Sequence, residues 1–248
     1  MSQYRFGLSS RLFANEPLSR EHLVHIAAHG FDAIELFATA AHFDCRQPEL
    51  LAEFAEWLSD TRLTLHAVHA PDAASPEDLD VLLAAAQQVP YPFLNLHVNG
   101  ASARTLEAFA ERASTVGVRV ALEVRNEPRS QVEALVHLLE DELEDTDADI
   151  GICLDFGHAH LAGDLGDAIE ISSGHLFTTH VHDNRGRRDD HLVPYEGTIR
   201  WESAVMETQK VGYDGVLMFE PAASADPVGV LQRCARARAR LEESFITF

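Results

Sequence analysis

The chain has 248 residues, of which 46% are hydrophobic, and a formal net charge of −21 at pH 7. A chain of this length can bury one large core, so we expect a single domain over residues 1–248. The negative charge disfavours nucleic acid as a partner, because proteins that bind DNA or RNA usually carry a basic surface for the phosphates.

Neither membrane association nor export is expected from the sequence. The N-terminal residues lack the basic and apolar regions of a signal peptide, and no stretch has the 18 or so uninterrupted apolar residues of a membrane-spanning helix. The three cysteines, Cys45, Cys153 and Cys234, are far apart and form no CxxC pair, which argues against a disulfide framework or a thiolate zinc site. We therefore expect a cytoplasmic protein.

Short apolar runs rich in β-branched and aromatic residues alternate eight times with amphipathic helical stretches. Turn residues separate these segments along the whole chain. The predicted strands are Arg5–Leu8, Ala33–Leu36, Leu63–Val68, Phe93–Val98, Val118–Val124, Ile150–Asp155, Phe177–His182 and Val216–Glu220.

Two of the predicted helices begin with the sequence of a capping box. Ser75 with Asp78, and Ser130 with Glu133, have the spacing at which each side chain accepts a backbone N–H that the helix leaves unpaired. The last helical segment contains RCARARAR (Arg233–Arg240), whose arginines spread over much of a helix surface and indicate a solvated helix. A contact of this helix with nucleic acid or another subunit is the alternative.

Eight β–α units in about 250 residues match the size and order of a TIM barrel. A doubly wound open sheet is the alternative, but the sequence has no G-x-G-x-x-G after the first strand. We therefore predict an α/β protein with a single-domain (β/α)8 TIM barrel. In such barrels the chemistry is located at the carboxyl ends of the strands, so polar residues should gather there.

Polar residues do gather at the predicted carboxyl ends of strands three to eight. They are His66, His69, His97, Glu123, Arg125, Asp155, His158, His160, His180, His182, Asp183 and Glu220. Any one histidine near a strand end is more often a hydrogen-bonded structural residue than a ligand. Glu35, in the apolar run AIELF, either orients a substrate hydroxyl or is a structural carboxylate with its own partners.

Three carboxylates in apolar runs, Glu123 in LEV, Asp155 in LDF and Glu220 in FEP, need compensation if they are buried. One divalent cation would compensate all three, and carboxylate with imidazole is the ligand mixture of Zn²⁺, Mn²⁺, Fe²⁺ or Co²⁺. The alternative is an ion-pair network without metal, in which Arg125 pairs with Glu123, and Arg185 or Arg187 pairs with Asp155 or Asp183.

The segment THVHDNRGRRDDH, which ends the seventh predicted strand, combines three histidines, three aspartates and three arginines. His180, Asp189 and His191 can supply a further set of metal ligands. The glycine gives the loop flexibility, and arginines such as Arg185 favour an anionic substrate.

Taken together, the motifs resemble the xylose isomerase-like TIM barrel superfamily, which includes sugar phosphate isomerases and epimerases and the endonuclease IV group. The segments that carry the resemblance are FDAIELF, LHAVHAP, LHVNG, ALEVR, LDFGHAH, HVHDNRGRRDDHLVPYEGTIRW and MFEP.

In the epimerase branch, the resemblance implies one divalent metal held by Glu123, Asp155, His180 and Glu220. Glu123 and Glu220 would also exchange protons with the carbon next to a substrate carbonyl, through a metal-stabilised enediolate, and His158 would contact the sugar. His66, Arg125, His182 and Arg185 are further candidates for substrate contact, and His66 and His182 are alternatively partners that fix imidazole tautomers.

In the endonuclease IV branch, the resemblance implies a three-metal site. Its additional ligands would be His69, His97, His158, Asp189 and His191. All nine ligand types are present, and a metal cluster suits the hydrolysis of a phosphoester. A DNA-repair role is disfavoured by the net charge and by PDAASPED (Pro71–Asp78), which offers no side chain to insert into a duplex.

Three functions follow as hypotheses. The first is a metal-dependent isomerase or epimerase of a sugar, sugar phosphate or keto acid, with one to three ions of Mn²⁺, Zn²⁺, Co²⁺ or Mg²⁺. The second is a multinuclear phosphoester hydrolase similar to endonuclease IV. The third is a ligand-binding barrel without turnover. We expect a small-molecule substrate, no nucleic acid or membrane partner, and a homo-oligomer, which isomerases of this kind often form.

Overall fold

The computed structural model describes residues 5–98, 100–143, 146 and 148–245, and these form a closed barrel of eight parallel strands in the order β1 to β8. Strand β1 pairs with β8 as well as with β2, so the sheet has no free edge. The strands are β1 (Arg5–Ser9), β2 (Ala33–Phe37), β3 (Thr64–His69), β4 (Phe93–Leu96), β5 (Arg119–Glu123), β6 (Ile150–Asp155), β7 (Leu176–Val181) and β8 (Val216–Phe219).

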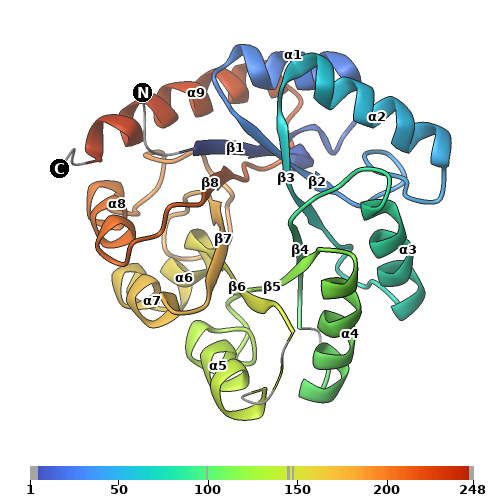
Figure 1. The fold of residues 1–248 in the computed structure, drawn as a ribbon. Helices are drawn as coiled ribbons and strands as arrows, with labels where there is room; N and C mark the ends of the chain where they lie inside the picture. The colour runs from blue at the N-terminus through green and yellow to red at the C-terminus, as the bar shows by residue number, and fades with distance from the viewer. Residues whose placement is uncertain (1–4, 99, 144–145, 147, 246–248) are drawn as a thin grey trace.

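The helices surround the barrel as an outer layer, and the view along the barrel shows them as a ring around the strands (Figure 1). They are α1 (Arg20–Ala28), α2 (Pro48–Thr61), α3 (Pro76–Ala86), α4 (Ala103–Thr115), α5 (Val132–His137), α6 (Phe156–Ala162), α7 (Leu165–Ser172), α8 (Trp201–Lys210) and α9 (Pro227–Ser244). Two short segments, η1 (Ser10–Phe13) and η2 (Leu138–Glu142), complete the secondary structure of the described residues.

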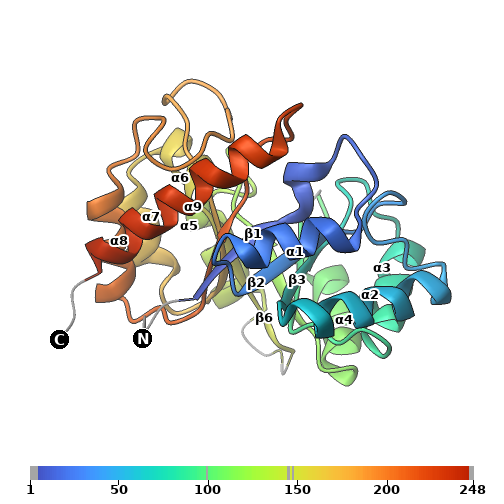
Figure 2. The ribbon, with the colours of Figure 1, turned by 90° about the horizontal axis from the view of Figure 1, so that it is seen from above.

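The predicted TIM barrel is confirmed, and each predicted strand overlaps one strand of the structure. Strands β4 and β8 end earlier than expected, at Leu96 and Phe219, so His97 and Glu220 directly follow their strands. Helix α9 lies beside α1 and α8 on the outside of the barrel (Figure 2). Within the described residues, no helix has both the length and the apolar character needed to cross a bilayer.

One of the two predicted capping boxes is confirmed and the other is wrong. Ser75 Oγ accepts the backbone N–H of Asp78, whose carboxylate accepts the N–H of Ser75 in return. Helix α5 instead begins after Gln131, and no side-chain bond caps it. Ser130 is held in the preceding turn, where its carbonyl accepts the Arg125 N–H. Ser130 therefore belongs to the turn and does not cap helix α5.

The apolar core fills the space between the strands and the helices, while the inward face of the strands becomes polar towards their carboxyl ends. Leu8, Ile34 and Leu122 are fully buried in the core. Inside the barrel, Met218 of β8 pairs in register with His180 of β7. Glu220 follows two residues after Met218, just beyond the end of β8. Because paired residues of parallel strands face the same side, this register directs His180 into the barrel.

Candidate metal centre

Four buried side chains meet at the carboxyl ends of β5 to β8. Glu123, Asp155, His180 and Glu220 each offer one ligand atom, and these atoms all lie within 4.8 Å of one another. His180 Nδ1 lies 3.4 Å from a Glu123 oxygen and 3.7 Å from an oxygen of Asp155 and of Glu220. We call these four residues the central group. The sequence predicted all four as ligands of one ion, and the structure brings them together.

His180 is oriented by a carboxylate on its other ring nitrogen. Its Nε2 lies 2.9 Å from Glu35 Oε2, which also accepts Asn95 Nδ2 at 2.6 Å. Burial would raise the pKa of Glu35, but the adjacent His180 outweighs burial and lowers it. Oε2 of Glu35 thus has partners of its own, as expected for a structural carboxylate, and it turns Nδ1 of His180 towards the central group.

Two atoms of the central group are buried without a hydrogen-bond partner among the described residues, His180 Nδ1 and Glu220 Oε2. Burial would raise the pKa values of Glu123 and Asp155, yet the surrounding histidines keep both well below their ordinary values, so both are carboxylates. Buried carboxylates and an unpaired imidazole nitrogen aimed at one point are the donors that a divalent cation requires. The residues therefore fit a metal.

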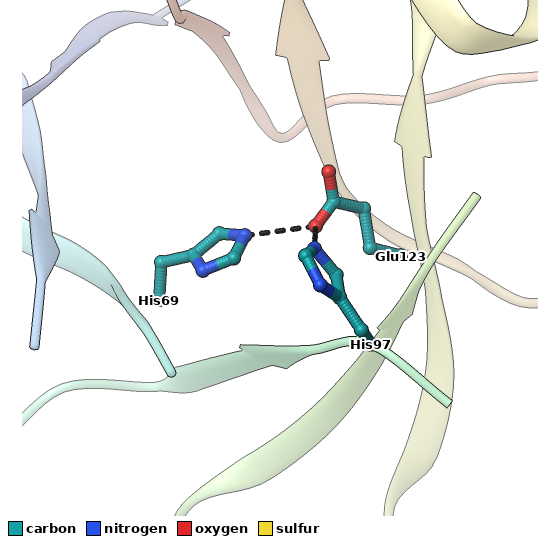
Figure 3. Close-up of side chains that lie close together, drawn as sticks. All are labelled: His69, His97 and Glu123. Carbon is teal, nitrogen blue, oxygen red and sulfur yellow. Dashed lines mark hydrogen bonds and ion pairs between the residues drawn. The ribbon is translucent and has the colours of Figure 1, made fainter. Parts of the chain in front are cut away.

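A second set of donors, His69, His97 and Glu123, shares Glu123 with the central group (Figure 3). Nε2 of His69 and Nε2 of His97 lie 2.8 and 2.6 Å from the same Glu123 oxygen, Oε2. His69 donates through Nδ1 to the Ala70 carbonyl at 2.8 Å, and Phe37 stacks on its ring. We call this set the Glu123 side group.

A third set, here called the loop group, consists of His182, Asp189 and His191. His191 Nε2 lies 2.8 Å from Asp189, and its Nδ1 donates to the Glu220 carbonyl. The His182 ring stacks on His191 with centroids 3.9 Å apart, and its Nε2 lies 3.0 Å from Asp155. His182 Nδ1 is buried without a partner among the described residues.

The sequence predicted His180, Asp189 and His191 as a further set of ligands, but in the structure His182 joins Asp189 and His191, while His180 lies in the central group. His158 lies nearby, with Nε2 3.6 Å from Asp189, and remains a predicted ligand and catalytic contact. The expected role of His182 in substrate contact is not suggested by its position, because its side chain is fully buried. Gly157 makes this position possible, since a Cβ there would lie 2.0 Å from His182 Cε1.

Among the other candidates, His66 lies apart from the three groups. The register between β2 and β3 skips His66, which therefore lies in a bulge of β3. Nε2 of His66 is 3.2 Å from Thr178 Oγ1 on β7. Burial lowers the pKa of His66 to about 4. Arg125 contacts His97, whereas Arg185 is exposed on the β7 loop. The contacts of these residues with a substrate stay predictions.

The ion-pair network without metal is not the arrangement found in the described part of the chain. Arg125 pairs with Glu127 rather than Glu123. Asp155 is bound by the imidazole of His182 and the backbone N–H of His158. The alternative pairing of Arg185 or Arg187 with Asp155 or Asp183 is therefore not found among the described residues.

Asp183 holds the loop that follows β7. Its carboxylate accepts backbone N–H groups from Asn184, Tyr195, Gly197 and Ile199, and the indole N–H of Trp201 at 2.8 Å. Its backbone also pairs with Leu192. These bonds return the chain across the barrel mouth, which places Asp189 and His191 beside the central group.

Sequence reasoning missed Arg11 at the mouth of the barrel. Its Nη1 lies 3.5 Å from Glu220 Oε1, and its guanidinium lies over the Phe37 ring at 5.7 Å. Arg11 follows β1, far in sequence from every ligand, and nothing in SSRLF distinguishes it from a surface arginine. Only barrel closure, which places β1 beside β8, brings it to the site.

The chain is similar to proteins of known sequence and structure over nearly its whole length. It is 27% identical to an uncharacterized protein of Methanocaldococcus jannaschii, over 87% of this chain and 83% of that protein. A D-tagatose 3-epimerase-like protein, 24% identical, superposes with a TM-score of 0.76 and covers 96% of this chain and 98% of its own. The IolI protein with a bound zinc atom, 15% identical, has a TM-score of 0.81 over 98% of this chain and 100% of its own.

The family model described as xylose isomerase-like TIM barrel matches residues 23–241, which include every residue of the central group. The closed barrel and the positions of the candidate ligands at the strand ends agree with this match. The chain belongs to the xylose isomerase-like TIM barrel family.

Proposed function

We propose that the protein is a divalent-metal-dependent isomerase or epimerase that moves a proton next to the carbonyl group of a sugar or sugar derivative. The observation that carries this proposal is the central group, in which Glu123, Asp155, His180 and Glu220 offer ligand atoms within 4.8 Å of one another. Zn²⁺, Mn²⁺, Co²⁺ and Mg²⁺ are the candidate ions. When bound, such an ion would polarise a substrate carbonyl and an adjacent hydroxyl.

The positions of the two glutamates support proton transfer. Glu123 ends β5 and Glu220 directly follows β8. On the two strands between them, Asp155 ends β6 and His180 is the second-last residue of β7. A substrate held over the centre would therefore have one carboxylate on each side. One glutamate would remove the proton and the other would return it, which is the arrangement that an epimerisation requires.

The proposal also draws support from the similar structures. One is described as D-tagatose 3-epimerase-like, and another, IolI, binds zinc. The proposal of a sugar substrate rests on the similarity to the D-tagatose 3-epimerase-like protein. The proposal of a metal rests on the donor atoms of this chain together with the similarity to IolI.

Exchange with solvent tests the proposal directly. The metal-loaded protein is incubated in D₂O with a panel of ketoses, ketose phosphates and keto acids, and deuterium incorporation is measured by mass spectrometry or NMR. We expect exchange with at least one compound, and a loss of about 10³-fold or more in Glu123→Gln and in Glu220→Gln. Glu111→Gln, on the exposed face of α4, should exchange like the wild type. Absence of exchange with every compound would overturn the proposal.

A multinuclear phosphoester hydrolase is the second candidate. The Glu123 side group and the loop group favour it, because they place further donors beside the central group. It requires two or three ions per chain and cleavage of a phosphodiester such as bis(p-nitrophenyl) phosphate. One ion per chain after purification without chelator, together with no cleavage, would exclude this candidate.

A further inference from the structure

We propose that Arg125 occupies the second ring nitrogen of His97 and thereby keeps the Glu123 side group free of metal. The inference deepens the proposed function, because it decides which donors around Glu123 hold an ion. It rests on hydrogen-bond chemistry in the site and not on turnover.

A histidine that binds a metal through one ring nitrogen almost always donates a proton from the other nitrogen to an oxygen. His69 follows this rule through the Ala70 carbonyl, and His180 follows it through Glu35. His191 does so through the Glu220 carbonyl.

His182 conforms as well, since its Nε2 faces Asp155 and its Nδ1 faces the loop group. The second nitrogen of each of these four histidines has a carboxylate or carbonyl oxygen as its acceptor.

His97 departs from this rule. Its Nδ1 lies 2.8 Å from Nη1 of Arg125, and a guanidinium can only donate. The guanidinium therefore takes the place at Nδ1 that an oxygen holds in the other four histidines. Nε2 of His97 faces Glu123 Oε2 at 2.6 Å (Figure 3). Without an oxygen hydrogen-bonded to Nδ1, the ring lacks the partner that orients a metal-binding imidazole.

Charge acts in the same direction. Nη1 of Arg125 also lies 3.2 Å from Nε2 of His97, the atom that a metal in this group would contact. A divalent cation there would face a permanent positive charge at close range. Occupation of the Glu123 side group therefore requires Arg125 to withdraw, whereas the central group needs no such change.

The site contains the acceptor that would restore His97 as a ligand. Asp72 Oδ1 lies 3.4 Å from the same Nδ1, and the Asp72 side chain is largely exposed. If the guanidinium is removed, this carboxylate can accept a proton from Nδ1, which leaves Nε2 free for a metal. Removal of Arg125 should therefore add a metal position.

The experiment counts metal ions. Chelator-stripped protein is reloaded with Zn²⁺ or Co²⁺, passed over a desalting column, and analysed by inductively coupled plasma mass spectrometry. We expect Arg125→Met to bind one ion per chain more than the wild type, and the additional ion to be lost in the double variant Arg125→Met with His97→Ala. The matched control, Arg129→Met, removes an exposed arginine from the same loop and should retain the wild-type count.

Two results would overturn the proposal. One is an equal metal count in Arg125→Met and the wild type. The other is the loss of one ion from the wild type on His97→Ala alone. Neither result depends on the deuterium exchange that tests the proposed function, so the two proposals can fail separately.

A measurement on the wild type avoids any folding defect of the variants. In ¹⁵N NMR spectra of histidine-labelled protein, assigned with His97→Gln, we expect the ring nitrogen signals of His97 to be the same before and after Zn²⁺ is added. The His180 Nδ1 signal should move on addition of Zn²⁺. A zinc-bound Nε2 on His97 would contradict the proposal.

Discussion

The histidines of the centre differ in which proton they hold, and this difference follows from their individual partners. Burial alone would lower the pKa of His69, but the adjacent Glu123 carboxylate outweighs burial and raises it to about 9. Burial alone would also lower the pKa of His191, but the adjacent Asp189 outweighs burial and raises this pKa to about 9. In the metal-free protein both rings are therefore imidazolium ions paired with carboxylates, and each must lose a proton before it binds a metal.

The first prediction at this scale concerns pH. A group whose pKa is higher in the folded state contributes stability that is fully present below its unfolded value, about 6.5, and is lost as the pH rises through its folded value. With pKa values of about 9, His69 and His191 should each contribute up to about 3 kcal/mol that disappears between pH 6.5 and 9. We expect the metal-free protein to be less stable at pH 9 than at pH 6.5.

Urea unfolding in EDTA at the two pH values measures this difference. His191→Gln should reduce the dependence on pH, while His25→Gln, in an exposed ion pair with Glu21, should leave it unchanged. A free energy of unfolding that is equal at both pH values, or larger at pH 9, would show that these imidazoles are not charged in the folded state.

At the scale of elements, the centre depends on how closely β6, α6 and β7 approach one another. Asp155 ends β6 and caps α6 through the N–H of His158, so the same side chain serves the helix and the central group. Gly157, in the first turn of α6, leaves the space that the His182 ring fills. Within four residues, the sequence DFGH therefore contains a candidate ligand that caps a helix, Asp155, and the glycine that lets His182 approach, Gly157.

The second prediction tests this approach. Gly157→Ala places a Cβ 2.0 Å from His182 Cε1, so the ring or the helix must move. We expect a loss of about 1–3 kcal/mol in the free energy of unfolding, and weaker metal binding by the loop group. Chemical denaturation and metal titration measure the two effects. Gly163→Ala, at the other end of α6 with nothing within 4 Å of its added Cβ, should change neither. Equal effects of the two substitutions would show that the contact is unimportant.

At the scale of the whole molecule, acidic residues outnumber basic ones by 40 to 19. Three of the four arginines of α9 form ion pairs, Arg233 with Glu196, Arg238 with Glu242 and Arg240 with Glu202, as expected for a solvated helix. Such exposed pairs contribute about 0–1 kcal/mol each. The unmatched carboxylates repel one another over longer distances, so self-repulsion opposes the folded state.

The third prediction follows from this balance. Salt screens the repulsion among surface carboxylates as well as the few favourable pairs, and the repulsion is the larger effect at this net charge. We expect the melting temperature of the metal-free protein to rise by about 5 °C between 0.05 and 1 M KCl. Differential scanning fluorimetry in EDTA measures it, with an uncharged solute at equal osmolality as the control. A fall in melting temperature would mean that the attractive pairs dominate.

The sequence alone determined the barrel and the central group, because both depend on local patterns. Apolar runs of strand length alternating with amphipathic helices give the order of the elements, and parallel strands in that order place all their carboxyl ends at one mouth. Glu123, Asp155, His180 and Glu220 each lie within two residues of the end of a predicted strand, so their convergence follows from the topology alone.

The tertiary structure alone decided which neighbours share a hydrogen bond. His182 rather than His180 joins Asp189 and His191, because the space beside Gly157 admits the His182 ring. Arg11 reaches Glu220 only because β1 closes on β8, and Arg125 meets His97 from the next strand around the barrel. These contacts depend on side-chain directions across separate strands, which a pattern along one chain does not encode.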